Sequence, residues 1–119
     1  MTNVAGAIKR LGYNGTSLDN ISATVSWWAP SGVYPTRYPS DSAWEPAMKS
    51  FMAYAGPQLK AQGLYVRASA GKAGPSDGSA TKAWWTALAP YVSGFLVEYF
   101  VEAYDQGLYY NDPNNYHGF

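Results

Sequence analysis

Two carboxylates stand at the ends of two short apolar segments, and each segment is entered through a glycine. Asp19 closes the segment that begins at Gly15, and Glu98 lies in the segment that begins at Gly94. An ionisable group in an apolar strand is costly if it is buried without a partner. If both segments are strands of one parallel sheet, both carboxylates emerge at the same edge of that sheet. We therefore expect an acid pair there, suited to acid–base chemistry.

Helical and strand-like segments alternate along the chain. Apolar residues with helical spacing and terminal stop signals predict helices over residues 4–11, 41–62 and 80–89. Short apolar runs predict strands over residues 16–21, 64–69 and 95–100. Strands that alternate with helices imply right-handed crossovers and a parallel sheet, with adjacent strands in chain order. The predicted fold class is α/β, with about three βα units in one domain over residues 1–119.

The long middle helix has several local signals. Ser42 and Glu45 have the spacing of a capping box, and Gly56–Pro57 predicts a kink or a break. Ser79 is the expected cap of the next helix. The buried stripe of the middle helix is predicted at Trp44, Met48, Phe51, Ala55 and Leu59.

Composition narrows the possible functions. The 119 residues carry a formal net charge of +0 and only 13% charged side chains, so nucleic acid is not an expected partner. Cysteine is absent, which excludes thiolate zinc sites and cysteine nucleophiles. No apolar run reaches the roughly 20 residues of a membrane span, and the N-terminus shows no signal-peptide pattern. His117 stands alone and no phosphate-binding glycine loop is present, so we predict no metal and no cofactor.

Four segments together resemble a family of glycoside hydrolases with a (β/α)8 barrel, similar to endo-α-1,4-polygalactosaminidases and α-galactosidases. They are Leu-Gly-Tyr-Asn-Gly-Thr-Ser-Leu-Asp-Asn at 11–20, Tyr-Pro-Thr-Arg-Tyr-Pro at 34–39, Leu-Tyr-Val-Arg-Ala-Ser-Ala-Gly at 64–71 and Val-Ser-Gly-Phe-Leu-Val-Glu-Tyr-Phe at 92–100. The resemblance covers nearly the whole chain but only the central part of such a barrel. It implies a partial barrel, hydrolysis of a polysaccharide and an extracellular location.

The resemblance also assigns roles by position. Asp19 would be the nucleophile and Glu98 the acid/base. The substrate-binding residues expected on this basis and from their aromatic or polar character are Asn20, Trp27, Trp28, Tyr34, Tyr38, Arg67, Ser69 and Tyr99. Ser69 takes a position where the family often has Asn, and Asn14 one where it often has Asp.

Other interpretations of these residues stay open. Asp19 can cap the loop that follows it, and Glu98 can pair with Arg67, which can orient an acid or shield a strand edge. Aromatic rings of the long loop over residues 22–40 can hold sugar rings or anchor that loop. An incomplete barrel leaves open sheet edges, so we expect a homo-oligomer or a missing barrel half as partner. The alternative function is a non-catalytic carbohydrate-binding or structural α/β fragment that oligomerises.

Overall fold

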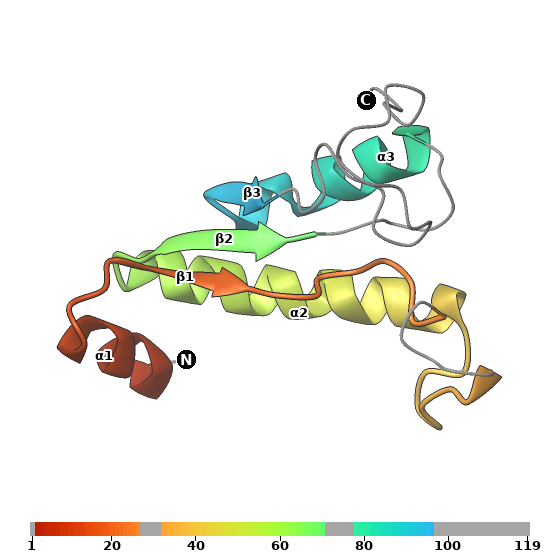
Figure 1. Cartoon of the computed structure of the whole chain (residues 1–119), viewed down its shortest axis with the longest axis horizontal. Coiled ribbons are helices and arrows are strands. Elements are labelled where there is room, and N and C mark those ends of the chain that lie inside the picture. The colour runs from red at the N-terminus through yellow and green to blue at the C-terminus, as the bar shows by residue number, and fades with distance from the viewer. Residues whose placement is uncertain (1, 27–31, 71–77, 97–119) are drawn as a thin grey trace, which may run out of the picture.

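The computed structural model describes residues 2–26, 32–70 and 78–96 (Figure 1). All structural statements below concern these ranges. Four residues with predicted roles lie outside them: Trp27, Trp28, Glu98 and Tyr99. Within the described ranges, no helix is both long enough and apolar enough to cross a membrane.

A three-stranded parallel sheet forms the centre of the fold. Its strands are β1 (Gly15–Leu18), β2 (Tyr65–Ser69) and β3 (Gly94–Leu96), in the order β1-β2-β3. This confirms the predicted parallel pairing of neighbouring strands in chain order. The register sets Arg67 of β2 opposite Ser17 on one side and Gly94 on the other.

Helices connect the strands and cover one face of the sheet. The helices are α1 (Thr2–Arg10), α2 (Asp41–Ala61), α3 (Gly78–Leu88) and the short 3-10 helix η2 (Ala89–Tyr91). Figure 1 shows α2 running along the sheet beneath β1 and β2. A buried cluster joins Met52 and Leu59 of α2 and Leu88 of α3 to Val66 and Ala68 of β2. The α/β class is therefore shown.

The middle helix begins at Asp41, as predicted, but its N-cap differs from the prediction. Ser40 is the N-cap, and its side chain accepts a hydrogen bond from the backbone of Ala43, so the capping box predicted from Ser42 and Glu45 is wrong. Ser40 satisfies a free amide at the helix start in the same way, two residues earlier. Helix α3 likewise begins at Gly78, one residue before its predicted cap, Ser79.

Tertiary packing explains the other departures in α2. The helix continues without a break through Gly56 and Pro57 as one 21-residue helix. Gly56 is buried because η2 lies so close that a β-carbon there would come within 2.1 Å of the Tyr91 carbonyl oxygen. The buried residues are Met52, Ala55, Gly56 and Leu59. Phe51, predicted to be buried, is 41% exposed. The buried stripe of α2 passes through Met52 rather than its neighbour Phe51.

The two faces of the sheet differ sharply. Along β2, Val66 and Ala68 are fully buried against the helices, whereas Tyr65 is 54% exposed and Arg67 is exposed. Successive side chains of a strand point to opposite faces, so Tyr65 and Arg67 share the face that no described helix covers. We call this the open face.

Candidate functional site

The turn after β1 carries the predicted nucleophile. Asp19 is the first residue beyond the strand and is exposed, and its Oδ1 accepts a hydrogen bond of 2.8 Å from the backbone of Asn20. Asn20 adopts a left-handed backbone conformation with φ 57°, which asparagine tolerates better than most residues. The chain then returns to the sheet, where the Ile21 amide donates to the Ser69 carbonyl at 3.0 Å. Asp19 thus lies at the carboxyl end of a parallel strand, and among the described residues its hydrogen bond is a local one, to Asn20.

Three tryptophans hold the backbone where it leaves the sheet. Their indole N–H groups donate to main-chain carbonyls: Trp84 to Ile21 (3.1 Å), Trp44 to Ser22 (2.9 Å) and Trp85 to Ala70 (3.0 Å). A buried indole usually finds a hydrogen-bond acceptor. These tryptophans, which we call the tryptophan frame, fix the segments after β1 and β2 against α2 and α3. The sequence places them in helices but does not indicate their acceptors.

Asp41 fixes the loop after β1 to the start of α2. Its carboxylate accepts from the Val25 amide (2.8 Å), the Ser26 amide (2.8 Å) and the Ser26 hydroxyl (2.7 Å). Burial favours the neutral acid, but the hydrogen bonds from Ser26 and Val25 together outweigh burial and hold the pKa of Asp41 below its usual range. Sequence reasoning missed this role. An acid in the first helical turn was the only signal for it.

The predicted substrate-binding residues of the described ranges differ in how far they are exposed and in what they contact. The Tyr38 ring packs edge-on against Trp44, with centroids 5.5 Å apart, and Arg37 lies 6.0 Å from the Tyr38 centroid. These contacts support an anchoring role for Tyr38. Tyr34 is 37% exposed. Ser69, predicted to contact substrate, is only 3% exposed.

Arg67 lies on the open face between β1 and β3. Its Nε donates to the Ser17 hydroxyl at 3.4 Å, a long hydrogen bond between neighbouring strands. Ser17 is paired with Arg67 in the sheet, so the two side chains share one face, whereas Asp19 lies one residue beyond β1. Among the described residues, no ion pair joins Arg67 to Asp19. Whether Arg67 pairs with Glu98 falls outside the described residues.

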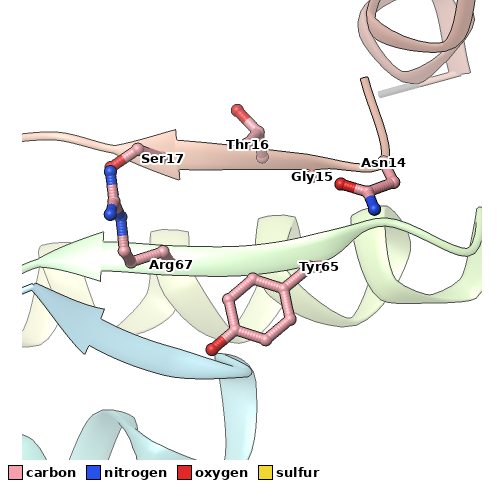
Figure 2. A pocket seen from close by; sticks show the side chains of 6 residues that line it. All are labelled: Asn14, Gly15, Thr16, Ser17, Tyr65 and Arg67. Carbon is pink, nitrogen blue, oxygen red and sulfur yellow. The ribbon is translucent and has the colours of Figure 1, made fainter. Parts of the chain in front are cut away.

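A shallow pocket opens beside Arg67 (Figure 2). Its volume is about 350 Å³, and its lining is formed by Asn14, Gly15, Thr16, Ser17, Tyr65 and Arg67. Figure 2 shows the Arg67 side chain reaching toward Ser17 and the Tyr65 ring lying toward β3. We call this the open-face pocket. Among the predicted site residues it includes only Arg67, and the described ranges contain no cluster of side chains suited to a metal ion.

Comparison with known proteins does not assign this chain to a family. No family model matches the sequence, and the comparisons with curated proteins and with solved structures found no match. A functional assignment therefore depends on the sheet, its carboxyl edge and the open-face pocket.

Proposed function

We propose that the chain is part of a (β/α) barrel that hydrolyses O-glycosidic bonds of a polysaccharide, with Asp19 and Glu98 as the acid pair. The observation that carries the proposal is the exposed Asp19 at the carboxyl end of β1, in a parallel sheet whose strands follow chain order. Barrel enzymes keep their reacting groups at this edge.

The register of the sheet is compatible with an acid pair. Arg67 is level with Gly94 of β3, so Leu96 is level with Ser69 and, on the same count, with Asp19. If the strand predicted over residues 95–100 keeps this register, Glu98 shares the face of Arg67. Glu98 itself lies outside the described residues.

The chemistry follows from two carboxyl groups on one side of a sugar bond. Glu98, as the acid, donates a proton to the leaving oxygen, and Asp19, as the anion, meets the positive charge that develops at the anomeric carbon. A separation of about 5 Å allows Asp19 to attack and form a covalent intermediate, and roughly 6.5–9.5 Å leaves space for a water molecule instead. Both outcomes remain within the proposal.

The proposal also requires a partner. Strands β1 and β3 are the two edges of the described sheet, and the open face carries no described helix. Parallel sheets normally have both faces covered, and a barrel has no edges. We therefore propose that further βα units or a second copy of the chain complete the barrel. Sedimentation should show a dimer or larger species, and a cooperatively melting monomer would contradict this part.

The test of the acid pair uses Asp19→Asn and Glu98→Gln. Each should lower the release of reducing sugar from galactosaminans, galactans or glucans by at least about a hundredfold, because the amide neither carries charge nor donates an acidic proton. Glu45→Gln is the matched control, since Glu45 pairs with Lys49 on the surface of α2. Thermal melts exclude unfolding as the cause. Activity that survives Asp19→Asn would show that the nucleophile is wrongly assigned.

A second candidate function is carbohydrate binding without catalysis. It is favoured by one observation, the exposed Tyr65 ring beside Arg67 in the open-face pocket. Binding at this pocket should survive Asp19→Asn and Glu98→Gln, whereas hydrolysis should not. The two candidates are therefore separable in the same pair of variants.

A further inference from the structure

The ring of Tyr65 is held in a fixed position on the open face. Its hydroxyl donates to the Ser93 carbonyl at 3.2 Å. The neighbouring strands carry glycines beside it: a β-carbon at Gly94 would lie 2.5 Å from the Tyr65 hydroxyl, and one at Gly15 would lie 2.8 Å from its carbonyl oxygen. The ring therefore occupies space that a side chain on Gly94 would take, yet Tyr65 stays 54% exposed. A fixed and exposed aromatic ring is a surface on which the C–H face of a sugar packs.

Arg67 supplies charge next to this ring. It follows Tyr65 by two residues on the same face, which places the two Cα atoms about 7 Å apart. The Ser17 hydroxyl holds its Nε and turns the guanidinium toward β1. A guanidinium has five N–H donors, and its planar fork matches the two oxygens of a carboxylate.

The remaining lining makes the pocket selective for an anion with hydroxyl groups. Asn14 and Ser17 add an amide and a hydroxyl group, and Arg67 is the only charged residue of the six that line the pocket. The volume of about 350 Å³ lies at the small end of ligand sites. The pocket therefore suits a short saccharide rather than a long segment of a chain.

We infer that the open-face pocket binds an acidic sugar, with a uronic acid residue stacked on Tyr65 and its carboxylate held by Arg67. The inference rests on the second candidate function, carbohydrate binding on the open face, and names the class of sugar. Hydrolysis is not needed for it. A uronic acid meets all three chemical features, because it combines an apolar ring face, ring hydroxyls and one carboxylate.

The test measures binding by the full chain with amide chemical shifts and calorimetry. The probes are short oligomers of galacturonic and glucuronic acid, compared with oligomers of galactose, glucose and galactosamine. Uronic acid oligomers should bind more tightly than the neutral ones, shift the amides of residues 14–17 and 65–67, and weaken as salt is raised.

Four variants sharpen the result. Arg67→Met should weaken uronic acid binding by about tenfold or more, to the level of neutral sugars, and Arg67→Lys should restore only part of it. Tyr65→Leu should weaken acidic and neutral sugars alike, because it removes the ring and keeps an apolar side chain. Arg10→Met is the control, since it removes an exposed cation on α1 and should leave binding unchanged.

The possible outcomes test separately the acidic class of the sugar, the position of the site and carbohydrate binding itself. Equal binding of acidic and neutral oligomers, or binding unaffected by Arg67→Met, overturns the acidic class while carbohydrate binding stands. Shifts confined to residues outside the pocket overturn the site. No binding of any saccharide overturns both the inference and the carbohydrate-binding function on which it rests.

Discussion

The two faces of the sheet use the same strand for different purposes. On the covered face, Val66 and Ala68 are fully buried, and Leu18 and Phe95 pack at the edge of the same cluster. On the open face, the strand presents an aromatic ring and a guanidinium. Burial of apolar area is the main stabilising contribution to a fold, so stability should depend on the covered face. The open face can then carry the groups that the proposed sugar site requires without a large cost in stability.

The largest effect should come from the covered face. Leu88→Ala removes a fully buried side chain of α3 from the core cluster and should lower the free energy of unfolding by about 3 kcal/mol. Leu11→Ala is the matched control, because Leu11 is 73% exposed and its loss should change stability by less than about 0.5 kcal/mol. Urea denaturation measures both. Equal losses would remove the distinction between core and surface.

The tryptophan frame should give the next largest effect. Trp84→Phe keeps most of the buried ring but loses the N–H that reaches the Ile21 carbonyl, so unfolding should become easier by about 1–2 kcal/mol. Tyr13→Phe removes a polar group from a ring that is 65% exposed and should have almost no effect. Hydrogen exchange should also rise selectively after β1 in Trp84→Phe. Uniform exchange across the chain would argue against a local frame.

Asp41 should give a smaller effect that depends on pH. Asp41→Asn should lower the free energy of unfolding by about 1 kcal/mol at pH 7, because hydrogen bonds to a charged group are lost. The folded-state pKa of Asp41 is lowered, so its contribution is complete above the unfolded value of about 3.9 and disappears as pH falls through the folded value. Stability curves of the two proteins should therefore converge below about pH 4. Parallel curves down to acid pH would contradict this role.

The smallest effect should come from the open face. Arg67 is exposed, so Arg67→Met should change the free energy of unfolding by less than about 0.5 kcal/mol. Thermal melts of the variant and the parent, compared at equal concentration, measure this change. A large loss of stability would mean that the arginine supports the sheet, and the division between a stabilising face and a binding face would not hold.

Sequence patterns predicted the order and pairing of the strands, because these patterns depend on residues that are close together in the sequence. Apolar periodicity and glycine turns were sufficient for three parallel strands in chain order and for Asp19 at the end of β1. They were insufficient where two distant segments meet. Gly56 was interpreted as a breaker, although its missing side chain lets η2 approach. Local signals alone cannot distinguish a glycine needed for a turn from one needed for packing.

The site shows the same limit. Asp41 meets Val25 across 16 positions of sequence, and Trp84 meets Ile21 across 63. Tyr65 received no role from the sequence, because the position of its ring depends on Ser93 and Gly94, which are distant in sequence. The roles of Glu98, Trp27, Trp28 and Tyr99 stay predictions, since these residues lie outside the described ranges.

The tryptophan frame has a consequence for how this molecule can diverge. Each indole binds a main-chain carbonyl, at Ile21, Ser22 and Ala70, and every residue type offers that acceptor. The hydrogen bonds therefore do not depend on the identity of the residues that they hold. Side chains at Ile21, Ser22 and Ala70 can therefore be exchanged without removing the hydrogen bonds that hold the backbone after β1 and β2.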